Sequence, residues 1–463
     1  MIAGVVLAGG KGVRMKSSLP KLFHNLLGKP IIRYVLDNLS ELKLNKTILV
    51  IPPNQEGDFR KVVEDLETKK DQKIEIVYVF QEEPLGTGDA LRRAMPELEG
   101  FDTVLVVNGD APLITDEIFK GLLDSYRDDV SAVVLSTILD DPMHYGRVIK
   151  NKDGNVIKIV EAKDASEEER EIKEVNTGAY CFSVEDLKAA IEKIDNNNAQ
   201  EEYYITQLVE ILNRMGKKVI SCQTDLGSLA LGINSRLDLA LATRKLLQEK
   251  LERLMDEGVT IVSPENTYIE IDVSVGKDTV IEPFSVLKGS TVVGERCIIG
   301  PSTYLLNAYI GNECEIFYSV IKNSKIESNV RVGPFAHIRD GTHIKSHSAI
   351  GDFVEVKKST IGSYTKALHL SYLGDAEIGE KVNIGAGTIT CNYDGKTKHK
   401  TTIEDEAFIG SNTCLRAPIK IGRGAITGAG SVVLKDVEPG TTVVGVPARP
   451  IERKPKEEGG KSE

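Results

Sequence analysis

KALHLSYLGDAEIGEKVNIGAGTITCNYDG, residues 366–395, places one histidine, two tyrosines and two asparagines among residues that are otherwise mostly small, apolar or typical of turns. A stacked solenoid has no structural use for an imidazole at such a position. His369 is therefore the first candidate for chemistry in this sequence. The pattern around it predicts both a fold and a reaction.

A six-residue repeat runs through the C-terminal half of the chain. The dipeptide Ile-Gly or Val-Gly is absent from residues 1–250 and occurs twelve times from residue 275 onward. Its first residues are Val275, Val293, Ile299, Ile310, Val332, Ile350, Ile361, Ile378, Ile384, Ile409, Ile421 and Val444. Several separations are 6, 12 or 18 residues, so we expect each unit to form one short strand and a turn, with three units in each stacked coil. An antiparallel β-domain would instead show a period of two.

The repeat slips once, next to the histidine. Ile384 and Ile409 are 25 residues apart, and the polar segment CNYDGKTKHKTT, residues 391–402, lies in the gap. This composition indicates a loop extruded from the solenoid. Loops carried by a rigid scaffold are common places for function.

The N-terminal half has a different texture. Strand-like runs are expected at Ile2–Leu7, Thr47–Ile51, Ile74–Phe80, Thr103–Val107 and Ala132–Thr137, and helical runs at Ile31–Leu42, Asp58–Lys69, Asp89–Leu98 and Asp116–Tyr126. Their alternation predicts a doubly wound, Rossmann-like α/β domain with a largely parallel sheet. The leucine-rich segment Ser235–Asp256 predicts a long connecting helix. We therefore expect domains at 1–232 and 257–451, a linker helix at 233–256 and a disordered tail at 452–463.

Composition limits the class of protein. A chain of 463 residues with 41% hydrophobic and 27% charged residues is expected to be globular, with at least two domains. It contains no apolar run long enough to cross a membrane, and we expect its first apolar stretch to be a buried strand rather than a signal peptide. The net charge of −11 argues against nucleic-acid binding, and six cysteines without metal-ligand spacing suit a reduced, cytoplasmic protein.

A glycine-rich segment follows the first predicted strand. LAGGKGVRM, residues 7–15, and Lys21 offer backbone N–H groups and positive charge to phosphate oxygens. Taken alone, this segment could be an ordinary glycine-rich turn. QEEPLGTGDA, residues 81–90, and NGDAPL, residues 108–113, follow two further strands, where open sheets bind ligands. Asp110 at such a strand end suits Mg²⁺, although a turn cap is the commoner role of a lone aspartate there.

These three segments together resemble the sugar-1-phosphate nucleotidyltransferases, and the hexads resemble the hexapeptide-repeat acyltransferases, whose fold is a left-handed parallel β-helix, usually trimeric. The whole chain resembles the bacterial bifunctional N-acetylglucosamine-1-phosphate uridylyltransferases/glucosamine-1-phosphate acetyltransferases. The resemblance implies acetylation of glucosamine-1-phosphate by acetyl-CoA, followed by Mg²⁺-dependent transfer of UMP from UTP. The expected product is UDP-N-acetylglucosamine, a precursor of peptidoglycan and lipopolysaccharide.

The resemblance also implies roles for residues of the uridylyl site. Leu7, Ala8, Gly9, Gly10 and Lys21 would contact nucleotide and phosphates, Gln81, Gly86 and Thr87 would read the uracil, and Asn108, Gly109 and Asp110 would lie along the ribose and metal. Gly146, Glu161 and Asn176 would hold the sugar, Asn234 would join Asp110 on Mg²⁺, and Arg14 would neutralise phosphate charge. Asn108 stands where many relatives have tyrosine, and Val13 where threonine is usual.

For the acetyl site, histidine has a pKa suited to removing a proton from an ammonium near neutral pH. His24, His144, His343, His347 and His399 lie among turn and charged residues, so we expect them on the surface. From the residues alone, His369 could equally be a buried, satisfied imidazole; the resemblance makes it the catalytic base. It further implies that Arg339 and Lys357 bind the sugar phosphate, that Tyr372, Asn383, Asn392 and Tyr393 bind the amino sugar or orient His369, and that Ala386, Ser411 and Ala429 line the acetyl-CoA channel. Lys398 would reach a neighbouring subunit's site.

Three alternatives stay open at this point. Several relatives carry arginine where this chain has Gly445, so Arg449 could supply the charge near coenzyme A. The β-helix could be a structural or trimerising scaffold attached to a monofunctional nucleotidyltransferase. The enzyme could also use dTTP and another sugar, because pyrimidine choice rests on small contacts.

Overall fold

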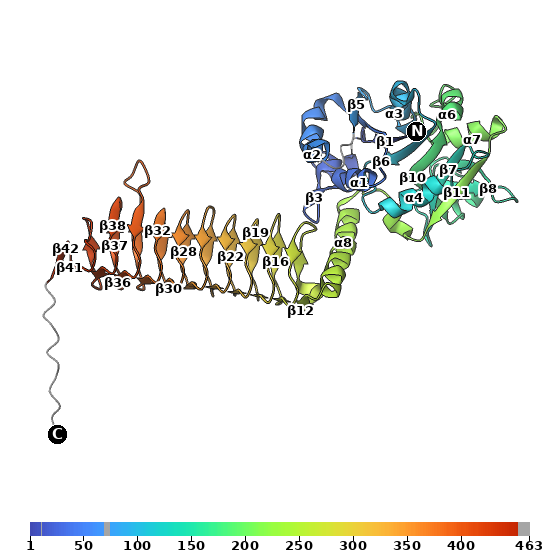
Figure 1. Cartoon of the computed structure of the whole chain (residues 1–463). Coiled ribbons are helices and arrows are strands. Elements are labelled where there is room, and N and C mark those ends of the chain that lie inside the picture. The colour runs from blue at the N-terminus through green and yellow to red at the C-terminus, as the bar shows by residue number, and fades with distance from the viewer. Residues whose placement is uncertain (11, 69–74, 452–463) are drawn as a thin grey trace. The chain divides into compact units, whose positions relative to one another are not determined.

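The computed structural model describes residues 1–10, 12–68 and 75–451 and contains two compact units, Met1–Arg244 and Lys245–Glu463 (Figure 1). The tail predicted at 452–463 lies outside the described residues. The boundary between the units falls inside helix α8 (Arg236–Asp256), which confirms the helix expected there. Each unit is described by itself below.

The first unit is built on a nine-stranded sheet. Its path is β11 (Val219–Thr224), β7 (Ala132–Ile138), β10 (Glu174–Ser183), β6 (Thr103–Asn108), β1 (Ile2–Leu7), β4 (Lys46–Ile51) and β5 (Ile76–Phe80), with β8 (Arg147–Lys150) and β9 (Val156–Val160) beside β10. The five predicted strands are confirmed within two residues, apart from Ile74, which lies outside the described residues.

Fewer pairs of neighbouring strands are parallel than the sequence predicts. Strands β6, β1, β4 and β5 are mutually parallel, as are β7 and β11. Strand β10 runs antiparallel to both β6 and β7. The β8–β9 hairpin and the one-turn helix α5 (Glu167–Arg170), rather than a long crossover helix, connect β7 to β10.

Helices cover both faces of this sheet. The buried side of α3 (Thr87–Ala94), α6 (Val184–Ile191) and α7 (Gln207–Arg214) shares one apolar cluster with alternate residues of β1, β4, β6 and β10. Helix α4 (Asp116–Asp124) packs on β7, β10 and β11 and contacts α1 (Ile31–Ser40). The remaining long helix is α2 (Glu56–Thr68). The predicted doubly wound arrangement is thereby confirmed.

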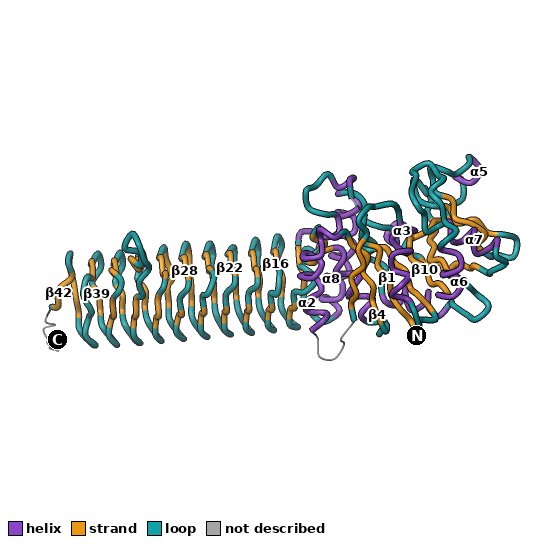
Figure 2. The backbone as a smooth tube through the Cα atoms, turned by 90° about the horizontal axis from the view of Figure 1, so that it is seen from above, coloured by secondary structure: helices purple, strands orange, loops and turns teal. Residues whose placement is uncertain are grey.

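The second unit is a parallel β-helix of three long sheets with 12, 10 and 9 strands. Its strands run from β12 (Thr260–Ile261) to β42 (Ala448–Pro450), each two to four residues long, with turns between them (Figure 2). Equivalent residues pair across coils, as Ile281 does with Ile299. Eleven of the twelve residues that mark the repeat are buried in its core. The exception is Val444 in β41 (Thr442–Gly445), where the antiparallel β42 ends the stack.

The C-terminal half of α8 belongs to this core. Leu251 and Leu254 join the apolar cluster of the β-helix, and the buried ammonium of Lys250 donates to the carbonyls of Ile271 (3.1 Å) and Val273 (2.6 Å). Burial, and secondarily Arg253, lowers the pKa of Lys250 to about 8. A lysine of the helix thus satisfies backbone oxygens of the first coil.

The loop predicted from the slipped register stands out from the stack between β34 (Ile389–Cys391) and β35 (Thr401–Ile403) (Figure 1). Tyr393 and Lys398 form an antiparallel bridge across it. The Asp394 carboxylate accepts the backbone N–H groups of Lys396 (2.8 Å) and Thr397 (2.7 Å). The extruded loop is therefore a defined hairpin.

Candidate functional sites

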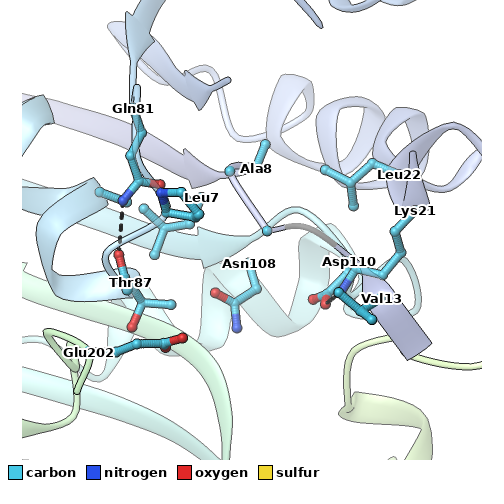
Figure 3. Close-up of a pocket in the computed structure, with 15 residues that line it drawn as sticks. Leu7, Ala8, Val13, Lys21, Leu22, Gln81, Thr87, Asn108, Asp110 and Glu202 are labelled. Atoms are coloured by element: carbon cyan, nitrogen blue, oxygen red, sulfur yellow. Dashed lines mark hydrogen bonds and ion pairs between the residues drawn. The ribbon is translucent and has the colours of Figure 1, made fainter. Parts of the chain in front are cut away.

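A cavity of about 420 Å³ opens at the carboxyl ends of β1 and β6 (Figure 3). The predicted residues that line it are Leu7, Ala8, Gly9, Gly10, Lys21, Gln81, Gly86, Thr87, Asn108 and Asp110. Gln81 and Thr87 lie at one end, Lys21 and Asp110 at the other, and Asn108 between them (Figure 3). Gly109 is not in the lining: its N–H donates to the Leu7 carbonyl (3.0 Å), and a Cβ there would lie 2.9 Å from Ile32.

A second cavity, of about 300 Å³, adjoins the first, since both are lined by Thr87, Asn108, Asp110 and Glu202. It also collects predicted residues from distant parts of the sequence. These are Arg14, Gly146, Glu161, Asn176 and Asn234. The two cavities therefore meet at Asp110 and bring together residues from distant parts of the chain.

Lys21, Asp110 and Asn234 form the polar centre of this region. The Lys21 ammonium pairs with Asp110 Oδ2 and donates to Asn234 Oδ1 (3.2 Å). Asp110 Oδ1 is buried without a hydrogen-bond partner. Gly232 packs against this carboxyl group so closely that a Cβ would lie 2.5 Å from Oδ1. A buried carboxylate oxygen without a partner, beside an amide oxygen, fits a divalent cation that prefers oxygen ligands.

The wall of the second cavity is hydrogen-bonded and partly desolvated. Burial raises the pKa of Glu161, whose Oε1 accepts from the Thr206 hydroxyl (3.1 Å). Asn176 donates to the Tyr180 hydroxyl (2.6 Å), and its own Oδ1 accepts the N–H of Gly178 (3.2 Å). These contacts fix the carboxyl and amide groups that sequence reasoning assigned to the sugar.

Two histidines that were both expected on the surface, His144 and His24, lie in different environments. His144 is exposed as expected, and it lies at the cavity with Nε2 3.3 Å from the Arg14 guanidinium. Burial and Arg14 lower its pKa. The expectation of a surface position was wrong for His24, which is 5% exposed and has Nδ1 3.1 Å from Arg236. Its turn-rich sequence context did not reveal that tertiary contacts cover it.

In the β-helix, three predicted basic residues gather at one place. Arg339 of β25 (His337–Arg339) pairs in register with Lys357 of β28 (Glu355–Lys357) on the next coil. Lys398 of the extruded loop contacts Lys357 of the same chain, and this contact is the main reason why the pKa of Lys357 is lowered. Arg339 also pairs with Glu355 (2.6 Å). Adjacent ammonium groups favour an anionic ligand.

The asparagine of the loop is held beside this cluster. Asn392 is buried, and its Nδ2 donates to Asp375 Oδ2 (2.5 Å) and contacts the Tyr372 hydroxyl (3.3 Å). Asp375, which sequence reasoning missed, therefore positions Asn392. Its signal was a charged residue in the turn YLGDA of the stretch that carries His369. Asn383 is half-buried on β33 (Asn383–Ile384), and Tyr393 is exposed.

His369 ends β30 (Lys366–His369) with an exposed imidazole. Its register partner on the preceding coil is Asp352. Lys366 pairs with Asn383, Asn383 with Phe408, and Phe408 with Ile426, so the residues three positions further on are also equivalent. Those residues, in coil order, are His369, Ala386, Ser411 and Ala429. The histidine and the three predicted channel residues thus occupy one corner of four successive coils.

The side chains at that corner change in size after the coil of His369. On the coils up to that of His369, the corner residues with left-handed backbone include the exposed side chains of Phe284, Tyr318, Phe335, Phe353 and Leu370. On the three coils after it, the equivalent left-handed residues are Gly387, Asn412 and Gly430. Bulky apolar groups therefore give way to small ones where a long, thin ligand would lie.

Known proteins match both units. A family model of a MobA-like NTP transferase domain matches residues 4–175, and bacterial transferase hexapeptide repeats match residues 272–307, 323–358 and 400–435. The "Bifunctional protein GlmU" of Geobacillus sp. (strain WCH70) is 45% identical over 94% of this chain and 93% of its own length. The proteins of that name from Syntrophomonas wolfei (43%; 96% and 97%) and Carboxydothermus hydrogenoformans (46%; 94% and 95%) agree. The chain belongs to the GlmU family.

Membership confirms the class of the protein. It is a bifunctional enzyme, a uridylyltransferase joined to an acetyltransferase, that produces UDP-N-acetylglucosamine. The predicted fold class is also confirmed: a nucleotidyltransferase domain followed by hexapeptide repeats that form a left-handed β-helix. The alternative of a monofunctional enzyme with an inert β-helix is not favoured. Within the described ranges, no helix is both long and apolar enough to cross a membrane.

Proposed function

We propose that the adjoining cavities of the first unit hold UTP and N-acetylglucosamine-1-phosphate. Gln81, Gly86 and Thr87 read the uracil at one end of the first cavity, and Asn108 lies along the ribose. The glycines at 9 and 10 admit the phosphates, and Lys21 adds positive charge. Gly146, Glu161 and Asn176 hold the sugar in the second cavity. This proposal is supported by the meeting of the two cavities at Asp110 and Asn234.

In the uridylyl step, an oxygen of the sugar phosphate attacks the α-phosphorus of UTP, and pyrophosphate leaves. Such a reaction needs no protein nucleophile, because positioning and charge neutralisation supply the rate. Arg14 and Lys21 carry that positive charge. Arg14 lies against His144, whose pKa is lowered by burial and by Arg14 itself. His144 is therefore neutral at neutral pH, and Arg14 can direct its positive charge to the phosphate.

Asp110 and Asn234 are the proposed ligands of Mg²⁺. The fit rests on the partnerless Asp110 Oδ1 and on the Asn234 amide oxygen, because Lys21 contacts the other oxygen of the same carboxyl group, Oδ2, as well as Asn234 Oδ1. When bound, the ion supplies charge neutralisation at the phosphates. Lys21 contacts both side chains and so holds them close to one another.

At the β-helix, His369 is the proposed general base for acetyl transfer. It accepts a proton from the ammonium of glucosamine-1-phosphate, and the freed nitrogen attacks the thioester carbonyl of acetyl-CoA. The C–S bond then breaks, and coenzyme A leaves as a thiolate that takes up the second proton released by the nitrogen. Arg339, Lys357 and Lys398 bind the phosphate. Tyr372 and Asn392, the latter held by Asp375, bind the amino sugar, together with Asn383 and Tyr393. The arm of acetyl-CoA that carries the thioester lies along the corner formed by Ala386, Ser411 and Ala429.

A homotrimer is the proposed assembly. Hexapeptide repeats favour oligomers, and His369 lies exposed on a single chain, whereas a site for acetyl transfer should exclude water. The exposed aromatic corner that ends at Leu370 offers apolar surface for another copy to cover. Tyr318, Phe335 and Phe353 stack along it, with ring centroids 5.7 and 5.4 Å apart. Six free cysteines are compatible with the proposed cytoplasmic location.

We keep the limits of the two domains, 1–232 and 257–451, as a proposal, with one practical change. Lys250, Leu251 and Leu254 pack on the first coil, so a fragment that is meant to fold should begin at Lys245. Acetyl transfer by residues 245–463 tests the assignment of the two sites. An active fragment with no uridylyl activity supports it, whereas an inert fragment of the same oligomeric size as the whole enzyme contradicts it.

The observation that carries the proposal is the gathering of fifteen of the sixteen predicted uridylyl-site residues in two adjoining cavities, with only Gly109 outside. A substrate panel tests the choice of substrates. UTP should be preferred to dTTP, and glucosamine-1-phosphate to other hexose phosphates; equal rates with dTTP would favour the alternative nucleotide. Arg449, which lies on β42 opposite Val444, stays the candidate for contacting coenzyme A in place of an arginine at Gly445.

A further inference from the structure

Gln81 is held by a carboxylate that was not among the predicted site residues. Its side-chain Nε2 donates to the Gly86 carbonyl (3.1 Å; Figure 3) and to Asp89 Oδ2 (2.9 Å). Asp89 lies in the first turn of α3, is 6% exposed, and accepts from Arg93 Nε (3.2 Å) through the same oxygen. Gln81 itself is 5% exposed. Both partners of the glutamine are therefore fixed parts of the scaffold.

These contacts determine which end of the amide faces which way. A carboxylate and a backbone carbonyl can only accept hydrogen bonds, so the nitrogen of Gln81 must face them and the oxygen must face away. An amide nitrogen has two hydrogens, and here each has an acceptor. Oε1 is left on the side of Gly9, where a Cβ would lie 2.3 Å from it. Gln81 thus offers the cavity an acceptor and no donor.

We propose that Asp89 is a positioning residue for base selection, which makes Gln81 an acceptor-only reader of the nucleobase. The inference rests on the proposed function, in which Gln81 faces the pyrimidine. Uracil carries a hydrogen on N3, which Oε1 can accept. The N3 of cytosine is itself an acceptor and would face the oxygen lone pairs of Gln81. Thymine also carries the N3 hydrogen, so this contact separates uracil from cytosine and not from its 5-methyl analogue.

Asp89 could also have a purely structural role. An acidic residue in the first turn favours a helix, and the ion pair with Arg93 spans one turn of α3. Either effect would change thermal stability and leave the preference among nucleotides unchanged. The ratio of kcat/KM for two nucleotides therefore distinguishes positioning from structural support.

The experiment uses the full-length enzyme with N-acetylglucosamine-1-phosphate and UTP, CTP or 5-methyl-UTP. In Asp89→Ala, the Gln81 amide loses its anchor and can turn its nitrogen to the base. The preference for UTP over CTP should fall about ten-fold, the effect of one misplaced hydrogen bond. The ratio of UTP to 5-methyl-UTP should stay constant. Asp89→Asn should keep most of the preference, because its Oδ1 can still accept from Gln81.

Two controls make the result decisive. Arg93→Ala removes the other partner of Asp89 and should leave the UTP/CTP ratio unchanged. Asp89→Ser retains a polar group in the first turn but is too short to reach Gln81, so it replaces Asp89→Ala if that variant does not fold. An unchanged ratio in Asp89→Ala or Asp89→Ser overturns the inference. If Gln81→Ala also leaves the ratio unchanged, the proposed placement of the base is wrong; if Gln81→Ala alone lowers it, only the role of Asp89 is wrong.

Discussion

The two units present their candidate residues in different ways. In the first, residues far apart in the sequence converge on two cavities at the ends of strands, and a single chain forms both. In the second, the residues lie along one corner and one face of a solenoid, at equivalent positions of successive coils. Among them, His369 is exposed. An α/β domain therefore builds an enclosed site by itself. A β-helix supplies a row of exposed residues, which a neighbouring chain would complete in the proposed trimer.

Removal of the proposed base is the sharpest way to separate the two regions. His369→Ala should lower acetyl transfer by about 10²–10⁴-fold, the usual contribution of a positioned base, and leave uridylyl transfer near wild type. Separate assays with glucosamine-1-phosphate and with N-acetylglucosamine-1-phosphate measure the two steps. Substitution of the exposed His347 is the control. Equal losses in both assays would mean that the two sites are not independent.

Asp110→Ala is the reciprocal test in the first unit. It removes the carboxylate that carries the partnerless Oδ1 and leaves Lys21 without its ion-pair partner, so uridylyl transfer should fall by about 10²–10³-fold, while acetyl transfer persists. Pyrophosphate release reports the first activity. Asp116→Ala removes a surface carboxylate paired with Lys120 and should affect neither. A mutant that still binds Mn²⁺ like the wild type would contradict the assignment of Asp110 as a metal ligand.

A smaller effect is expected at the basic cluster of the β-helix. Lys357→Ala or Lys398→Ala should each raise the KM for glucosamine-1-phosphate by about ten-fold, since each removes one charge-assisted contact with phosphate. Lys325→Ala, which removes an equally charged residue two coils before Lys357, is the control. If it raised KM by as much, general electrostatic attraction would explain the effect.

The same cluster should respond to pH in a definite direction. Lys398 lowers the pKa of Lys357, so Lys357 loses its proton at a lower pH than an ordinary lysine. In wild type, KM should therefore begin to rise at less alkaline pH than in Lys398→Met, where the main cause of the shift is gone. Identical pH profiles of KM for the two proteins would contradict the contact between these lysines.

The smallest effect on activity is expected at Lys250, which lies away from both sites. Its folded pKa of about 8 is below the ordinary value of 10.5, so between these values the unfolded chain binds more protons. Stability of the β-helix should then rise with pH across pH 8 to 10.5, by up to about 1.4 kcal/mol per pH unit. Lys250→Met should lack this increment, which thermal unfolding of the two proteins would reveal. Both activities should be unchanged.

Most of the fold could be predicted from the sequence, because the patterns that specify it involve residues close together along the chain. The hexads follow from the period of the buried aliphatic residues, and the extruded loop follows from a single break in that period. The supporting contacts were harder to find. Asp89 and Asp375 lie inside segments that drew attention, yet each acts through a hydrogen bond whose partner is set by folding.

By itself, the sequence determined the two fold classes, the loop and the residue types available at each site, because periodicity and turn chemistry depend on neighbours along the chain. Only the tertiary structure decided that β10 runs antiparallel and that His24 is buried. It also decided that Lys398 touches Lys357, and that Asp89 turns the Gln81 amide so that its oxygen faces the cavity. Each of these features depends on contacts between residues far apart in the sequence. Such contacts form only when the elements that carry those residues pack together.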